Sequence, residues 1–102
     1  MILNIYGSTG VIGKTILSIV KNQFPTYKIN LLCAKNNIKL LAKQVNQFKV
    51  KYVYLDNEKK INQLKSYISK DVTVLNKQSL KEYLYINKSD LSILSVSGYE
   101  SL

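Results

Sequence analysis

Residues 7–13 read Gly7-Ser8-Thr9-Gly10-Val11-Ile12-Gly13, with three glycines spaced three residues apart. The apolar run over 2–6 precedes this stretch and is typical of a short buried strand. Residues 11–22 follow it with apolar side chains at helical spacing. A glycine-rich loop between a strand and a helix indicates a phosphate-binding turn, because the free N–H groups at the start of the helix face the loop.

Each glycine of this loop has a separate expected role. Gly7 permits the tight turn out of the strand, Gly10 allows a pyrophosphate to approach the backbone, and Gly13 allows the helix to pack closely on the sheet. Backbone N–H groups at the helix start bind the phosphate, and the two hydroxyls of the loop add hydrogen bonds. The expected pyrophosphate site therefore comprises Gly7, Ser8, Thr9, Gly10, Val11, Ile12 and Gly13.

Apolar strand patterns alternate with helical patterns along the rest of the chain. The expected strands are 2–6, 28–33, 51–55, 72–75 and 91–96, and the expected helices are 11–22, 38–48, 57–68 and 79–85. This alternation predicts an α/β fold, a Rossmann-like, doubly wound parallel sheet in one domain spanning 1–102. Right-handed crossovers lead us to expect the strand order 3-2-1-4 around the switch point.

The end of the second expected strand indicates which dinucleotide the loop would bind. It reads Ala34-Lys35-Asn36-Asn37 and contains no acid, whereas an NAD site carries Asp or Glu here to bind the ribose 2′-hydroxyl. A cation and neutral donors suit a 2′-phosphate, so NADPH is preferred over NADH. We expect Lys35 and Asn36 to contact this phosphate, and Asn37 to cap the next helix.

Composition and charge narrow the classes of partner. The chain has 102 residues and a net charge of +9, and all fifteen basic residues are lysines. Because arginine dominates base contacts and bidentate phosphate contacts, we expect no nucleic-acid partner. No apolar run is long enough to cross a membrane and no signal peptide is evident, which leads us to expect a cytoplasmic protein without a membrane partner. The single cysteine, Cys33, fits a reducing compartment.

A P-loop is the main alternative for the same stretch. Residues 8–15 read Ser-Thr-Gly-Val-Ile-Gly-Lys-Thr, which is a P-loop with Ser8 in place of its first glycine. The apolar run over 53–55, which ends at Asp56, could then serve as the magnesium-binding strand. On this hypothesis the chain binds ATP or GTP and depends on Lys14. The missing glycine and the complete three-residue spacing favour the dinucleotide site.

The glycine loop at the N-terminus together with Ala34-Lys35-Asn36 resembles one family closely, that of 1-deoxy-D-xylulose 5-phosphate reductoisomerase. The stretches 52–56 and 95–98 also resemble that family. The resemblance implies conversion of 1-deoxy-D-xylulose 5-phosphate to 2-C-methyl-D-erythritol 4-phosphate in isoprenoid biosynthesis. It further implies NADPH, a divalent metal (Mg, Mn or Co), a phosphosugar substrate and a homodimer. By resemblance, residues 9–12 hold the pyrophosphate and residues 34–36 surround the adenosine 2′-phosphate.

The resemblance covers only the N-terminal quarter of that family, so we expect an incomplete, truncated domain with neither catalytic nor metal-binding residues. Three positions depart from the family pattern: Val11 replaces a usual serine, and Ala34 and Ser101 replace usual glycines. The Asp-x-Glu over 56–58 is expected to cap a helix. Cys33, Tyr83 and Tyr85 are expected to be packing residues. A non-catalytic nucleotide-binding remnant remains the second alternative.

Overall fold

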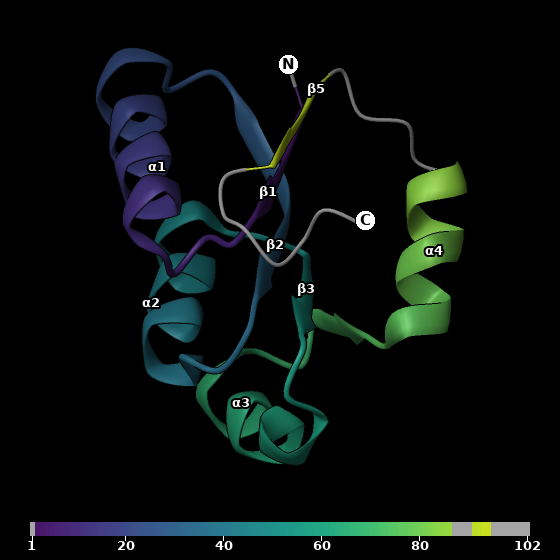
Figure 1. Ribbon diagram of the computed structural model, residues 1–102. Coiled ribbons are helices and arrows are strands. Elements are labelled where there is room, and N and C mark those ends of the chain that lie inside the picture. The colour runs from purple at the N-terminus through teal and green to yellow at the C-terminus, as the bar shows by residue number, and fades with distance from the viewer. Residues whose placement is uncertain (1, 87–90, 95–102) are drawn as a thin grey trace.

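The computed structural model describes residues 2–86 and 91–94, which form a parallel sheet with helices on both faces (Figure 1). The elements follow the expected alternation of strands and helices. In chain order they are β1 (Ile2–Tyr6), α1 (Val11–Gln23), β2 (Lys28–Ala34), α2 (Ile38–Phe48), β3 (Tyr52–Leu55), the 3-10 helix η1 (Glu58–Lys60), α3 (Ile61–Tyr67), β4 (Thr73–Leu75), α4 (Lys77–Ile86) and β5 (Leu91–Leu94). Residues 95–96 of the last expected strand lie outside the described residues.

The strand order is β4-β3-β2-β1-β5, and every pairing is parallel. The expected order 3-2-1-4 was wrong, because the fourth strand lies at the edge beside β3 and the fifth strand takes the place beside β1. The reason is that α3 packs on the same face as α1 and α2, so the right-handed crossovers continue in one direction as far as β4. The direction reverses once, through α4, and the switch point therefore lies between β1 and β5.

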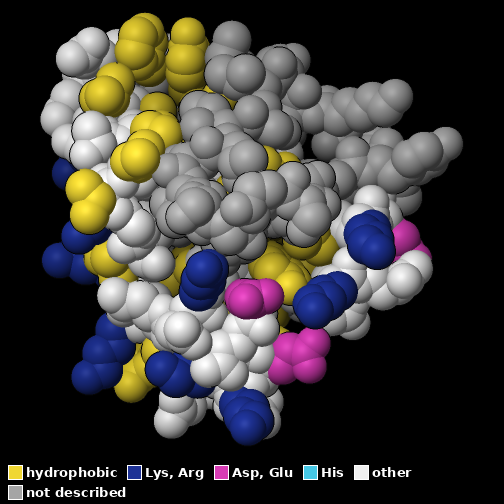
Figure 2. Space-filling view, viewed as in Figure 1, with side chains coloured by type: hydrophobic (Ala, Val, Ile, Leu, Met, Phe, Trp, Pro, Cys, Tyr) yellow, Lys and Arg dark blue, Asp and Glu magenta, His cyan; other side chains and the backbone are white. Residues whose placement is uncertain are grey.

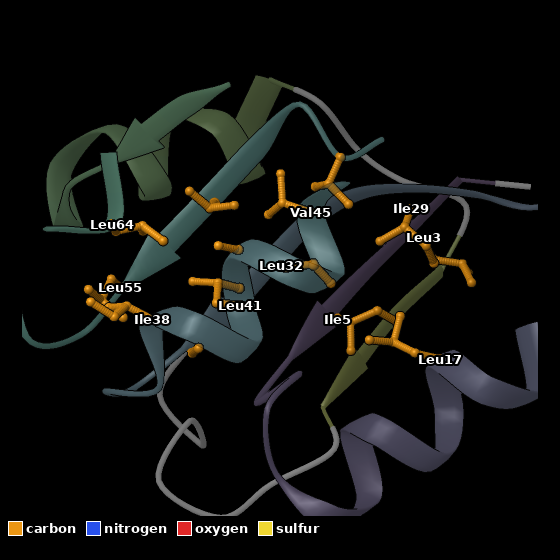
Figure 3. Close-up of a cluster of buried hydrophobic side chains, with 14 of the residues drawn as sticks. Leu3, Ile5, Leu17, Ile29, Leu32, Ile38, Leu41, Val45, Leu55 and Leu64 are labelled. Atoms are coloured by element: carbon orange, nitrogen blue, oxygen red, sulfur yellow. The ribbon is translucent and has the colours of Figure 1, made fainter. Parts of the chain in front are cut away.

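Helices α1, α2 and α3 cover one face of the sheet and enclose an aliphatic core (Figure 3). Leu3 and Ile5 of β1 meet Leu17 of α1 there, and Leu41 of α2 belongs to the same cluster as Leu32 of β2. All five side chains are almost completely buried. Burial of this kind contributes about 2 kcal/mol for each large aliphatic side chain, so this core holds α1, α2 and α3 on the sheet.

The opposite face carries α4 and a second core that is rich in tyrosine and polar groups. Leu80 and Tyr83 of α4 pack on side chains of β1, β2, β3 and β4, and the buried Cys33 lies among them. The Tyr83 hydroxyl accepts a hydrogen bond from the Asn30 side chain. Asn30 has no partner residue in β1, because the register of the β1–β2 pair shifts by one residue at this point. Cys33 and Tyr83 are therefore packing residues, as expected. The side chain of Tyr85 lies outside the described residues.

Two asparagines cap helices, and the sequence predicted the first of them, Asn37. The Asn37 side chain accepts a hydrogen bond from the backbone N–H of Leu40, which caps α2. Asn57 caps η1 in the same way, through the N–H of Lys59, and Glu58 lies in the first turn. The Asp-x-Glu stretch is therefore a capping element, although the expected single helix over 57–68 is divided into η1 and α3.

Candidate functional site

The loops that follow β1 and β2 lie against each other at the carboxyl ends of these strands. The backbone N–H groups of Gly7 and Ser8 both donate to the Cys33 carbonyl, at 2.7 and 3.0 Å. The glycine loop is therefore joined to the last residues of β2, one position before Ala34. In doubly wound sheets, ligands bind outside the carboxyl ends of the strands at the switch point. The glycine loop follows β1 at this point, and the loop after β2 lies next to it.

The glycine loop is a tight turn. Gly7 has a φ of 73°, in the left-handed region that favours glycine. The Gly10 N–H donates to the Gly7 carbonyl at 3.0 Å and closes the turn. Gly10 itself has an extended conformation, with φ −76° and ψ 173°, which any residue adopts. The glycine at position 10 is therefore not required by backbone conformation, in contrast to Gly7.

Gly13 is required because α1 lies directly on the loop. A Cβ atom at this position would meet the Gly7 carbonyl oxygen and would lie 2.7 Å from the Cα atom of Ser8. Real Cβ atoms do not approach other heavy atoms so closely. The sequence predicted close packing of the helix on the sheet, and the contact that excludes a side chain is with the loop backbone between strand and helix.

The first backbone N–H groups of α1 lie where this loop joins the helix, and they have no acceptor within the helix. The first helical hydrogen bond runs from the Lys14 N–H to the Gly10 carbonyl at 2.9 Å, so the N–H groups of residues 11–13 precede it. Gly10 is the N-cap and has no side chain to satisfy them. Val11 and Ile12 are 77% and 57% exposed. The turn therefore presents an exposed helix N-terminus, which attracts anions through its N–H groups and the helix dipole.

The two loop hydroxyls lie in different surroundings. Ser8 is completely buried, and its Oγ has no hydrogen-bond partner among the described residues. Thr9 is half-buried, so it is nearer to the outer surface of the loop. An unpaired buried hydroxyl costs about 1–3 kcal/mol. Ser8 is thus held inside the turn at a cost in stability.

The loop after β2 is tied to the loop after β3. Backbone N–H groups of Asp56 and Asn57 donate to the carbonyls of Ala34 and Lys35, at 2.9 and 3.0 Å. The Asn57 side-chain amide also donates to the Asn36 side-chain oxygen at 2.9 Å. The side chains of Lys35 and Asn36 are exposed, whereas Ala34 is fully buried in the aliphatic core. Among residues 34–36, only Lys35 and Asn36 offer side chains to a ligand.

The charge of the chain is distributed unevenly around these loops. Asp56 is the first acidic residue in the sequence, and the 55 residues before it contain eight lysines. Figure 2 shows lysine but no acidic side chains on the α1 side, and the acidic side chains visible in this view lie over the centre and towards α4. An acid-free half has a positive potential that attracts anions. The net charge alone does not reveal this asymmetry, because it does not show where the acidic residues lie.

The geometry disfavours a P-loop. A P-loop lysine has to reach the phosphates held in the loop. Lys14 instead lies within α1 and lines the groove between α1 and α2, together with Lys43 and Gln44. The helix begins at Val11, so Gly13 and Lys14 are part of its first turns and do not extend the loop.

Other site chemistries receive little support from the part of the chain that the structure describes. It contains no group of three or more His, Cys, Asp or Glu side chains that could hold a metal ion. Burial raises the pKa of the Cys33 thiol well above its usual range, so the thiol stays protonated and unreactive as a nucleophile. In the same residues no helix is long and apolar enough to span a membrane.

Fold and loop together define the class of protein, a Rossmann-like α/β domain with a glycine loop at the switch point. Comparison with known proteins is more specific. The family profile of 1-deoxy-D-xylulose 5-phosphate reductoisomerase matches residues 3–102. The chain belongs to this family, whose members are NADPH-dependent oxidoreductases of isoprenoid biosynthesis.

Relatives that are named 1-deoxy-D-xylulose 5-phosphate reductoisomerase come from several bacteria. The chain is 36% identical over 98 residues to the reductoisomerase of Thermoanaerobacter sp. strain X514, which covers 96% of this chain and 26% of the relative. It is 35% identical over 105 residues to that of Pelagibacter ubique strain HTCC1062, with the same coverage. The chain therefore spans about a quarter of the length of these curated relatives.

Solved structures of the family share the fold. The reductoisomerase of Zymomonas mobilis in complex with NADPH gives a TM-score of 0.67 at 24% identity, over 72% of this chain and 20% of that one. A reductoisomerase in complex with NADPH, fosmidomycin and magnesium gives 0.78 at 22% identity, over 90% of this chain and 23% of that one. The likeness confirms the Rossmann-like fold.

Sequence reasoning missed one residue beside the loop. Gln44 of α2 is 5% exposed, and its Nε2 donates to the Ser8 carbonyl at 2.8 Å. The sequence does contain a sign of this residue: Gln44 is a polar residue on the same face of α2 as the apolar Leu41 and Val45. A glutamine on such a face is unusual enough to suggest a specific hydrogen bond.

Proposed function

We propose that this chain binds NADPH as the cofactor-binding part of a 1-deoxy-D-xylulose 5-phosphate reductoisomerase. The observation that carries the proposal is the junction of the two loops at the Cys33 carbonyl. It sets an exposed helix N-terminus beside a loop that carries a lysine and no acid. The adenosine ribose of NADPH carries the pyrophosphate at its 5′ position and a phosphate at its 2′ position. The glycine loop suits the pyrophosphate, and the loop after β2 suits the 2′-phosphate.

The pyrophosphate binds at the N-terminus of α1. The N–H groups of Val11 and Ile12 donate to its oxygens, and the helix dipole stabilises its charge. The absence of a side chain at Gly10 allows the anion to approach the backbone. Thr9 adds its hydroxyl from the outer side of the loop.

The 2′-phosphate binds at the end of β2. The exposed ammonium of Lys35 pairs with it, and the Asn36 side-chain amide donates a hydrogen bond while its oxygen is held by Asn57. A carboxylate at this place would repel the phosphate. The acid-free N-terminal half of the chain steers the anionic cofactor towards the glycine loop.

The remaining parts of the reaction belong to the whole enzyme. In it, the bound cofactor supplies a hydride during conversion of 1-deoxy-D-xylulose 5-phosphate to 2-C-methyl-D-erythritol 4-phosphate. A divalent metal and the phosphosugar substrate, and the homodimer expected from the family, are part of this proposal. The described residues do not fit a metal, so the contribution proposed for this chain is to bind and orient NADPH.

Calorimetric titration of the 102-residue chain with NADPH, NADH and Mg-ATP in parallel tests the proposal. We expect NADPH to bind at least tenfold more tightly than NADH, since a charge-assisted contact to the 2′-phosphate is worth about 1.5–3 kcal/mol. Mg-ATP is expected to bind weakly, and its affinity should not change in Lys14→Ala. Tight binding of Mg-ATP that depends on Lys14, without a response to NADPH, would contradict the proposal.

A further inference from the structure

Gln44 is a buried polar residue on a helix face that otherwise packs in the core. Its neighbours on this face are Ile38, Leu41, Ala42 and Val45. Its side-chain oxygen has no hydrogen-bond partner among the described residues. A buried glutamine with an unpaired oxygen is less stable than an aliphatic side chain at the same place. The hydrogen bond from its side-chain amide to the Ser8 carbonyl is therefore the feature that distinguishes Gln44 from its neighbours.

We propose that Gln44 is a positioning residue that orients the Thr9 N–H group towards the bound pyrophosphate. The Ser8 carbonyl and the Thr9 N–H belong to one trans peptide, so they point in opposite directions. Because Gln44 holds the carbonyl on the α2 side, the N–H must point away from α2. This inference rests on the proposed binding of NADPH and adds a residue that does not itself contact the cofactor.

The rest of the loop explains why this peptide needs a separate restraint. The two preceding peptides are held through the N–H groups of Gly7 and Ser8, which both donate to the Cys33 carbonyl. The following one is held by the Gly10 N–H, which donates to the Gly7 carbonyl. Among the described residues, the peptide between Ser8 and Thr9 is held only through its carbonyl, by Gln44. Without Gln44 it could rotate within the turn and withdraw the Thr9 N–H.

Two variants separate this role from simple packing. Gln44→Met keeps the length of the side chain and removes the donor, whereas Gln44→Asn keeps the amide and is one methylene too short to reach Ser8. Gln47→Met is the matched control, since Gln47 is exposed one turn further along α2. Amide hydrogen exchange of Gly10 is measured without any ligand, and binding is then measured with NADPH and with adenosine 2′-monophosphate.

We expect exchange at Gly10, whose N–H donates to the Gly7 carbonyl, to accelerate about tenfold in both Gln44 variants, and NADPH to bind about tenfold more weakly. Adenosine 2′-monophosphate lacks the pyrophosphate, so its affinity should not change, whereas general destabilisation would weaken both ligands. Gln47→Met should alter none of these values. If one variant does not fold, the other decides.

Unchanged exchange and unchanged NADPH affinity in a folded Gln44 variant would overturn the inference. Equal weakening of both ligands would also overturn it, because it would indicate a structural role only. If the unaltered chain does not bind NADPH, the proposed function fails. The exchange rates then still decide whether Gln44 orders the loop.

Discussion

The glycine loop and the loop after β2 lie side by side, but they are held by different kinds of contact. The glycine loop is held by buried backbone hydrogen bonds and by Gly13, where no side chain fits. The loop after β2 presents exposed side chains, and Asn57 holds one of them from the neighbouring loop. The first site therefore depends on shape and the second on charge. Substitution of Gly13 in the first should affect folding and binding together, whereas substitution of Lys35 in the second should change cofactor preference alone.

The largest effect is expected for Gly13→Ala. The added methyl group would meet the Gly7 carbonyl and the Ser8 backbone, so either α1 or the loop must move. We expect a loss of about 3 kcal/mol in the free energy of unfolding and no measurable binding of NADPH. Urea denaturation and calorimetry provide the two measurements.

Gly10→Ala is the matched control for this prediction. Alanine can adopt the extended conformation of Gly10, so the free energy of unfolding should change by less than about 1 kcal/mol. Its methyl group should still hinder the approach of the pyrophosphate and weaken NADPH binding about tenfold. Equal stability of the Gly13→Ala and Gly10→Ala proteins would contradict the role given to Gly13.

Lys35→Glu should reverse the preference for the phosphorylated cofactor without affecting the fold. Replacing the ammonium with a carboxylate removes one charge-assisted contact and adds repulsion, so NADPH should bind about 30-fold more weakly. NADH should bind no more weakly than before. Lys51→Glu makes the same change in net charge at the amino end of β3, away from both loops, and should leave the ratio of the two affinities unchanged. A similar loss in both proteins would indicate long-range electrostatics only.

Asn57→Ser should have a smaller effect, because Asn57 acts on the loop after β2 through Asn36. Serine still caps η1 but is too short to donate to Asn36, so stability should change little while NADPH binds about fivefold more weakly. Asn57→Ala loses the cap as well and should unfold with about 1 kcal/mol less free energy. Thermal unfolding with parallel titrations distinguishes the two variants. Full NADPH affinity in Asn57→Ser would exclude a role for the Asn57–Asn36 bond.

The smallest effect is expected for Val11→Ser, which restores the residue usual in the family. Valine and serine have similar helix propensities, so α1 should be equally stable. The hydroxyl can donate to the pyrophosphate from the exposed first turn, and we expect about twofold tighter binding of NADPH. Weaker binding than in the unaltered chain would show that the apolar side chain contributes to the site.

The sequence predicted the elements of this fold well because the determining signals are local. The spacing of the glycines predicted the turn, and the helical spacing of apolar side chains after it predicted α1. Asn37 predicted the start of α2. The strand order was not predictable in this way, because it depends on which face α3 packs against, a long-range property. Gln44 was missed for the same reason. Its partner Ser8 lies 36 residues away, and no local pattern relates the two.

Amide resonances of the 102-residue chain, followed by NMR during titration with NADPH and with NADH, test the two-loop account most directly. Both cofactors should shift the resonances of Thr9, Gly10, Val11 and Ile12, because both carry the pyrophosphate. Only NADPH should also shift those of Lys35 and Asn36. Identical shifts with both cofactors, or shifts concentrated at Lys14 and Lys43 in the groove between α1 and α2, would contradict the account.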